Sequence, residues 1–269
     1  TLYNPAYAGF NSRNFAGINA NSIWTGINGH PRYFHCFYET PITKIKSGVG
    51  LTGLYDVYSA IVNSNISLSY NYQLKFNDNH NLNFGTKISF DHFQFDENKT
   101  INIDAIPTSN NRYTDFAVTA DIGLLYNYKD FTIGLSLNNI NSPEITLGTT
   151  WFKLENQIIF LADYKSKIKD GYILKHSFLF NENSSLSSDY YKSFYSVNNT
   201  LIIKEIFEVG FSIKTSDIKE FSIAYNIGVY VQKRLNINLI FDFDNSVGKL
   251  GNWPLPVYNF GGVISYKFK

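Results

Sequence analysis

The sequence predicts an all-β protein, specifically a transmembrane antiparallel up-and-down β-barrel of about 14 strands. Three observations carry this prediction. Long segments alternate apolar and polar residues with period two, which is the periodicity of a strand. The alternating segments run for about 10–15 residues, as membrane-spanning strands do, whereas globular strands average about 5–6. The connections between them also alternate between short and long along the chain.

The alternation is clearest between residues 62 and 76. One face of this segment carries mainly apolar residues, including Ile66, Leu68, Tyr70 and Tyr72, and the other face carries Asn, Ser, Gln and Lys. Such a strand has one face suited to lipid and one suited to a polar interior, since neighbouring residues point to opposite sides of a sheet.

The same pattern, divided by turn residues, predicts fourteen strands. We expect them at residues 13–26, 32–41, 46–58, 61–76, 80–95, 114–128, 130–140, 153–166, 171–182, 188–203, 205–214, 219–231, 233–244 and 256–269. The last strand places aromatic and apolar residues on one face up to Phe268, which is typical of the C-terminal strand of outer-membrane barrels.

The connections support a membrane barrel over a soluble sandwich. If the chain starts on the periplasmic side, every even-numbered connection is short, and the long ones, 96–113, 141–151 and 245–254, are all odd-numbered. Short periplasmic turns and longer extracellular loops are the usual asymmetry of outer-membrane barrels, and a sandwich has no reason to sort its loops in this way.

Composition agrees with this class and argues against others. Charged residues make up 17% of the chain and aromatic residues another 17%, with 20 Tyr. The net charge of +1 does not indicate a nucleic-acid partner. The sequence contains no Met and begins with Thr1, so we expect a mature chain in the bacterial outer membrane after signal-peptide removal.

The sequence shows no pattern of an enzyme, a metal site or a cofactor site. The five His residues are scattered, with no pair at chelating spacing on one element. Nucleotide-binding, metalloprotease and nucleophile-elbow motifs are absent from the sequence. We therefore expect no catalytic residues, no metal and no cofactor.

The N-terminal residues form a distinct motif, Asn4-Pro5-Ala6-Tyr7-Ala8-Gly9, ahead of the first strand. Pro5 restricts its own φ and biases Asn4 towards extended backbone, and Gly9 permits a tight turn into the strand. We expect residues 1–12 to form a short periplasmic segment that caps or plugs a single barrel domain spanning residues 1–269. A periplasmic docking surface is the alternative interpretation.

This motif resembles the opening of the PorP/SprF family of Bacteroidetes outer-membrane proteins, which belong to the type IX secretion and gliding machinery. The stretch from Trp24 to Pro31 is similar to a family pattern in its Trp, Gly26, Gly29 and Pro, although Asn21 and Ile23 depart from it. The Glu39-Thr40-Pro41 and Gly48-Val49-Gly50-Leu51 stretches follow in the family's order.

The resemblance implies a non-enzymatic component of type IX secretion. Such a component would bind a large secreted protein, a gliding adhesin or similar, through its C-terminal domain and support its export or cell-surface anchoring. Other type IX components, including periplasmic ones, are expected partners beside outer-membrane lipid. A passive or selective pore for small solutes is the alternative function.

Candidate residues for partner binding or barrel capping fall into three groups. The first is the N-terminal motif, with Asn4, Pro5, Ala6, Tyr7 and Gly9. The second is the first outer loop, with Trp24, Gly26 and Pro31, where Trp24 is either an interfacial belt residue or a partner contact. The third comprises aromatic residues of long loops, Tyr113, Trp151 and Trp253, which suit interface anchors or simple loop packing.

Overall fold

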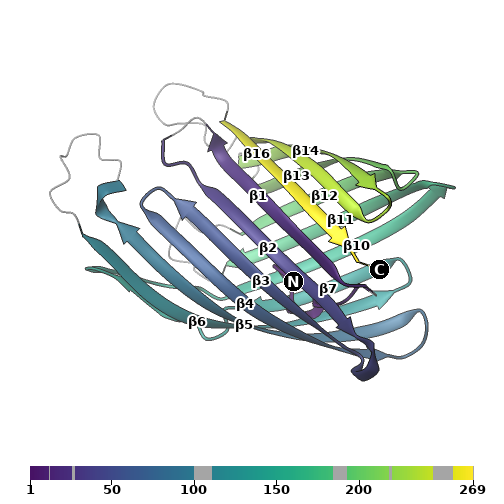
Figure 1. The fold of residues 1–269 in the computed structure, drawn as a ribbon, viewed down its shortest axis with the longest axis horizontal. Helices are drawn as coiled ribbons and strands as arrows, with labels where there is room; N and C mark the ends of the chain where they lie inside the picture. The colour runs from purple at the N-terminus through teal and green to yellow at the C-terminus, as the bar shows by residue number, and fades with distance from the viewer. Residues whose placement is uncertain are drawn as a thin grey trace.

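The computed structural model of the protein is a closed antiparallel β-barrel of fourteen strands (Figure 1). It describes residues 1–11, 13–25, 28–99, 111–183, 193–217, 220–244 and 257–268. The barrel strands are β1 (Phe15–Thr25), β2 (Arg32–Ile42), β3 (Ser47–Tyr58), β4 (Ile61–Lys75), β5 (His80–Asp96), β6 (Arg112–Tyr128), β7 (Phe131–Asn138), β10 (Gln157–Lys169), β11 (Tyr172–Asn183), β12 (Phe194–Ile203), β13 (Phe207–Asp217), β14 (Glu220–Val231), β15 (Leu235–Asp244) and β16 (Val257–Lys267).

Each barrel strand pairs with its neighbours in the chain, and pairing of β1 with β16 closes the sheet. The predicted fold class and strand number are therefore confirmed. Two further strands, β8 (Glu144–Leu147) and β9 (Thr150–Lys153), form a separate hairpin in the connection between β7 and β10. The sequence did not predict this hairpin, and the strand expected from residue 153 begins only at Gln157.

Three short 3-10 helices complete the described secondary structure: η1 (Pro5–Tyr7), η2 (Thr43–Ile45) and η3 (Glu97–Lys99). In the described ranges, no helix has both the length and the apolar character needed to cross a membrane. The connections 43–46, 76–79, 129–130, 170–171, 204–206 and 232–234 gather at one end of the barrel, which we call the short-turn end. The opposite, long-loop end carries the connections 97–111 and 139–156.

The two faces of the sheet have opposite polarity. Large apolar side chains point outward, as shown by the exposed fractions of Ile66 (63%), Leu68 (60%) and Phe116 (73%). Polar residues on the same strands, such as Ser67, Ser69 and Asn83, point inward and are buried. An apolar exterior and a polar interior are what a barrel in a bilayer requires, so localisation in the outer membrane follows from the fold.

Candidate functional site

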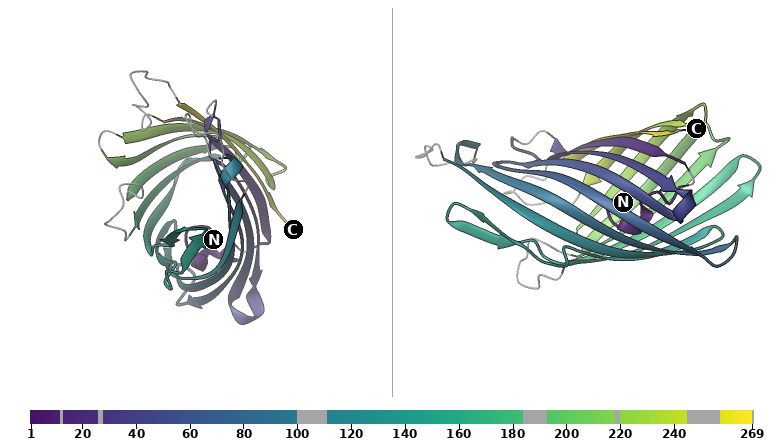
Figure 2. Two further views of the ribbon diagram at one scale, coloured as in Figure 1. Left: turned by 90° about the vertical axis from the view of Figure 1, so that its left-hand side faces the viewer. Right: turned by 60° about the horizontal axis from the view of Figure 1, so that its bottom comes forward.

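The N-terminal segment, residues 1–11, lies along the inner wall of the barrel and is the main candidate site. Its 3-10 turn η1 contacts β4, β5 and β6, and the two views of Figure 2 place it inside the barrel near the N label. Asn4, Pro5, Ala6 and Ala8 are fully buried. The segment thus occupies part of the lumen, against one side of the wall.

Local chemistry explains why the segment turns at this place. Asn4 has extended backbone, and its Oδ1 accepts a hydrogen bond from the Ala6 N–H at 2.9 Å, which caps the turn. Pro5 follows at the first position of the turn, where a missing N–H costs nothing. Gly9 has φ of +62°, a left-handed conformation that favours glycine.

A row of small residues on the inner wall receives the segment. Gly48, Asn71, Gly85, Gly123 and Ser136 are successive register partners across β3, β4, β5, β6 and β7. A Cβ at Gly85 would meet the backbone of Pro5 and Ala6, and one at Gly123 would meet the Asn4 side chain. The glycines therefore form a shallow groove in which the segment approaches the sheet closely.

Hydrogen bonds fix the segment to the strands beneath it. The Asn4 Nδ2 donates to the carbonyl oxygens of Leu124 (3.0 Å) and Leu135 (3.2 Å). The Asn71 Nδ2 donates to the Ala8 carbonyl at 3.2 Å, and the Ser136 Oγ donates to the Tyr3 carbonyl at 2.7 Å. All four of these hydrogen bonds end on backbone carbonyl oxygens of the segment or the wall. Docking therefore depends on the backbone path of the segment more than on its side chains.

Charged residues of the barrel wall surround the first two residues of the docked segment. The Thr1 hydroxyl donates a hydrogen bond to Glu39 Oε1 on β2 at 3.0 Å. Lys87 forms a buried ion pair with Asp121 at 2.6 Å, and its Nζ also lies 3.4 Å from the Leu2 carbonyl oxygen. A buried ion pair is stable only when its remaining donors are satisfied, so the Leu2 carbonyl is part of the environment that holds it.

Tyr7 reaches the opposite side of the groove. Its hydroxyl donates to Asp163 Oδ2 on β10 at 2.9 Å, and its ring packs edge-on against Phe10. Burial, followed by the neighbouring Asp163 carboxylate, raises the pKa of Tyr7 above its usual value. The segment therefore bridges strands on both sides of the short strand β7.

The β8–β9 hairpin also folds inward, at the long-loop end. Ile145 and Leu147 are buried against Phe93 and Ala117 on β5 and β6. The Thr146 N–H donates to Asp115 Oδ2 at 2.7 Å, and Gly148 packs against the Tyr113 ring. The hairpin and the N-terminal segment thus lie on the same side of the lumen, one towards each end of the barrel.

The first outer loop places Trp24 and Pro31 together without bringing them to the N-terminal segment. Trp24 is the last but one residue of β1 and has φ of +56°, within a register irregularity of the β1–β16 pairing between Ser22 and Thr25. Its backbone N–H donates to Asn259 Oδ1 at 2.7 Å, and its ring packs edge-on against Tyr58. The Pro31 carbonyl accepts from the Ile23 N–H at 2.9 Å. Gly26 lies outside the described residues.

The aromatic candidates of the long loops are separated from one another. Tyr113 lies at the start of β6, where its ring stacks on Phe95. Trp151 lies on β9 with 62% of its surface exposed. Trp253 lies outside the described residues. Of these candidates, Trp151 offers the large exposed apolar surface that a binding anchor requires.

Sequence reasoning identified the segment but missed what receives it. Among the inner-wall glycines, Gly48 entered only as part of a family stretch, and no docking role was predicted for Gly48, Gly85 or Gly123. The signal available in the sequence was that glycines recur on the polar faces of neighbouring strands, where a missing side chain permits close backbone approach. Among the residues that the structure describes, no group of His, Cys, Asp and Glu is arranged to hold a metal ion.

Comparison with known proteins gives one family match and several structural likenesses. The family model described as "Type IX secretion system membrane protein PorP/SprF" matches residues 1–255. No curated protein sequence matches this chain significantly.

Solved outer-membrane barrels share the fold at low identity. The toluene transporter TodX of P. putida has a TM-score of 0.59 at 8% identity, with 98% of this chain and 92% of that chain covered. A FadL homologue of Pseudomonas aeruginosa has a TM-score of 0.54 at 12% identity, covering 99% and 93%. The outer membrane protein Omp33 of Acinetobacter baumannii has a TM-score of 0.54 at 9% identity, covering 97% and 100%. At these identities the likeness concerns the fold alone.

Proposed function

We propose, from the premise that this chain belongs to the PorP/SprF family of type IX secretion system membrane proteins, that it acts as a non-enzymatic binding partner of a large secreted protein. The secreted protein is a gliding adhesin or a similar chain, recognised through its C-terminal domain. The barrel supports the export of this protein or its anchoring at the cell surface.

The observation that carries this proposal is the partly occupied lumen. Residues 1–11 and the β8–β9 hairpin both lie against the inner wall, which favours a scaffold over a wide aqueous channel. The hairpin at the same time presents Trp151 at the long-loop end, where a secreted partner would meet the barrel. An exposed Trp is a common interface anchor because it contributes a large contact area at low entropic cost.

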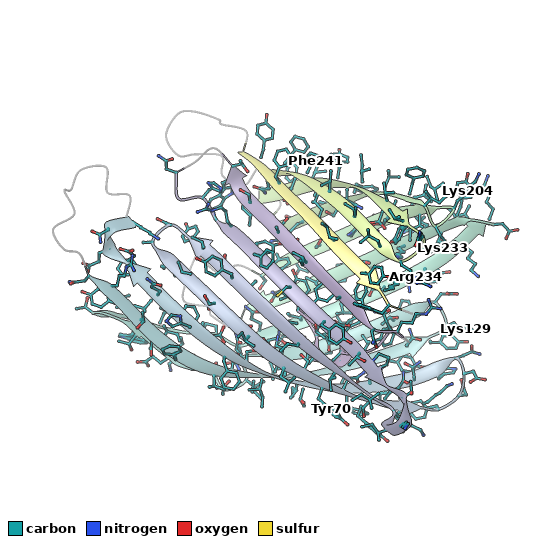
Figure 3. All side chains as sticks on the ribbon, viewed as in Figure 1. Tyr70, Lys129, Lys204, Lys233, Arg234 and Phe241 are labelled. Atoms are coloured by element: carbon teal, nitrogen blue, oxygen red, sulfur yellow. The ribbon has the colours of Figure 1, made fainter. Side chains whose placement is uncertain are left out.

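The short-turn end suits a periplasmic component of the secretion machinery. Every short turn carries or adjoins a lysine, and Figure 3 shows Lys129, Lys204, Lys233 and Arg234 gathered at this end of the barrel. Lys233 forms an ion pair with Glu205 at 2.7 Å. A rim rich in cations attracts an acidic protein surface, and this attraction weakens with salt.

Affinity purification tests the proposed partnership. The tagged protein would be extracted gently from its native outer membrane, and the proteins that co-elute would be identified by mass spectrometry. We expect a large secreted protein in near-stoichiometric amount. Trp151→Ala should reduce its recovery at least about tenfold, as expected for loss of a central aromatic anchor. Phe76→Ala, which removes an exposed aromatic ring at the short-turn end, serves as the matched control.

A pore for small solutes is the second candidate, and one cavity favours it. A space of about 250 Å³ lies between Tyr3 and the inner faces of β11, β12 and β13, lined by Ser177, Asn198 and Lys214. Polar groups line part of this space, beside Leu179 and Phe194, and a route for hydrated solutes needs such groups. Conductance in planar bilayers separates the candidates: a bare barrel that conducts steadily and never co-elutes with a partner would favour the pore.

A further inference from the structure

A groove crosses the outer surface of the barrel at the seam where β1 meets β2 and β16. Its floor consists of small residues, Ala20 and Ser22 on β1 and Gly262 on β16. Its volume of about 770 Å³ lies within the range of small-molecule sites, about 300–1,000 Å³. The recess exists because two paired strands, β1 and β16, place small side chains, or none, on the outward face at this level.

The walls of the groove show that it faces lipid. Phe34, Tyr55 and Phe260 line it, and each has about half of its surface exposed, at 43%, 50% and 52%. They belong to the outward apolar rows of β2, β3 and β16, which lie in the bilayer when the barrel spans it. The groove is therefore an apolar recess open to the hydrocarbon region.

Two cations lie at the outer end of this groove. Arg32 begins β2 and Lys99 ends η3, so both belong to the long-loop end, and both line the groove. Within the described part of the chain, neither side chain forms an ion pair with an acidic residue. The recess is thus apolar along its length and positively charged at its extracellular end.

We propose that this groove binds an acylated, phosphate-bearing glycolipid of the outer leaflet, of the lipid A class. An acyl chain lies over Ala20 and Gly262, and the phosphate group is bound by Arg32 and Lys99. The guanidinium of Arg32 matches a phosphate with two parallel hydrogen bonds, and the ammonium of Lys99 adds a point charge. Because the cations are at the long-loop end, the site selects lipid of the outer leaflet over phospholipid of the inner one. This proposal does not depend on the proposed secretion function.

Native mass spectrometry of the detergent-purified full-length protein tests the site. The probes are bis-phosphorylated lipid A and its dephosphorylated form. We expect wild type to retain one lipid A molecule through mild activation. The double variant Arg32→Ala/Lys99→Ala should bind it about 30-fold more weakly, from about fivefold for each interfacial cation. Dephosphorylated lipid A should bind wild type as weakly as lipid A binds the double variant.

A charge-matched control isolates the groove. The double variant Lys129→Ala/Arg234→Ala removes the same types of cation from the short-turn end, where Figure 3 labels both residues, and should bind lipid A like wild type. Equal loss in this control, unchanged binding in Arg32→Ala/Lys99→Ala, or equal affinity for dephosphorylated lipid A would each overturn the proposal. So would the recovery of a phospholipid or a protein on the groove in place of lipid A.

Filling the recess gives a second, independent variant. Ala20→Leu adds bulk to the outward face of β1, where the side chain meets lipid instead of the packed interior. Heat-modifiable migration in gels confirms that the variant barrel has folded. We expect Ala20→Leu to weaken lipid A binding while the cations remain in place. Full retention of lipid A by a folded Ala20→Leu barrel would contradict the placement of the acyl chain.

Discussion

Asn4 is the residue at which the N-terminal segment is most fully tied to the barrel wall. Its side chain is buried, donates to two carbonyl oxygens of neighbouring strands and accepts from the Ala6 N–H. We expect Asn4→Ala to weaken docking of the segment by about 2–3 kcal/mol, since the Ala6 N–H loses its partner in a buried place. Limited proteolysis within residues 1–11 in folded barrels measures this, and an unchanged cleavage rate would contradict it.

Tyr7 makes the docking sensitive to alkaline pH. A phenol whose pKa is raised by folding contributes stability that is fully present below its unfolded pKa of about 10. This stability is lost as the pH rises above that value, because the unfolded state then releases the proton first. We expect the segment to become more susceptible to proteolysis above about pH 10 in wild type, and to a smaller extent in Tyr7→Phe.

The ultraviolet absorbance of tyrosinate provides a direct reading of the same residue. The difference between the wild-type and Tyr7→Phe titrations should show no tyrosinate forming at about pH 10, the ordinary value for tyrosine. If that difference follows an ordinary tyrosine titration, the hydroxyl of Tyr7 is solvated and its contact with Asp163 does not persist in solution.

At the scale of elements, the inner faces of β5 and β6 are shaped to receive the segment. Gly85→Ala places a Cβ against the backbone of Pro5 and Ala6, which cannot yield as a flexible side chain would. We expect a loss of about 1–3 kcal/mol in segment docking, as is typical of overpacking. Gly262→Ala is the control because its nearest neighbour lies at 3.5 Å and its Cβ faces outward. Equal loss in both variants would indicate a general effect of glycine replacement in strands.

The β8–β9 hairpin is held by the apolar burial of Ile145 and Leu147. Ile145 is fully buried beneath it, whereas the Thr146 side chain next to it is exposed. Ile145→Ala should cost about 2–4 kcal/mol of hairpin docking through lost burial and a cavity. The hairpin would then be cleaved faster by protease added to intact cells. Thr146→Ala is the matched control, and equal cleavage of the two variants would refute the packing described.

Elements differ in how far the sequence determines them. The barrel strands were predicted within a few residues because period-two alternation is a local property, and each strand carries it independently. The β8–β9 hairpin was not predicted because its strands of four residues leave too little alternation to read. Its position depends on Phe93 and Ala117, which are distant in the chain. The groove of Gly48, Gly85 and Gly123 likewise exists only once the register of the four strands β3 to β6 is fixed.

At the scale of the whole molecule, charge separates the two ends of the barrel. Lysines mark the short turns, while acidic residues such as Asp96, Glu97 and Glu144 lie towards the long-loop end. The net charge of +1 conceals this separation, because the 23 Lys and Arg residues and the 22 Asp and Glu residues nearly cancel over the whole chain. Composition alone therefore gave no indication of a charged partner, whereas the fold shows two surfaces suited to partners of different charge.

This separation gives a test of orientation in the living membrane. A membrane-impermeant amine reagent applied to intact cells should label Lys153, which is exposed at the long-loop end, and Lys99 in those molecules where no lipid phosphate covers it. It should spare Lys129, Lys204 and Lys233 at the short-turn end until the outer membrane is permeabilised (Figure 3). Peptide mass spectrometry before and after permeabilisation measures the extent of labelling at both groups of lysines. Short turns face the periplasm in bacterial barrels. The reverse order of labelling would require the long loops, Trp151 and the cations Arg32 and Lys99 of the outer groove to face the periplasm. The proposed contact with a secreted protein and the proposed binding of outer-leaflet lipid would then both fail, whatever the fold.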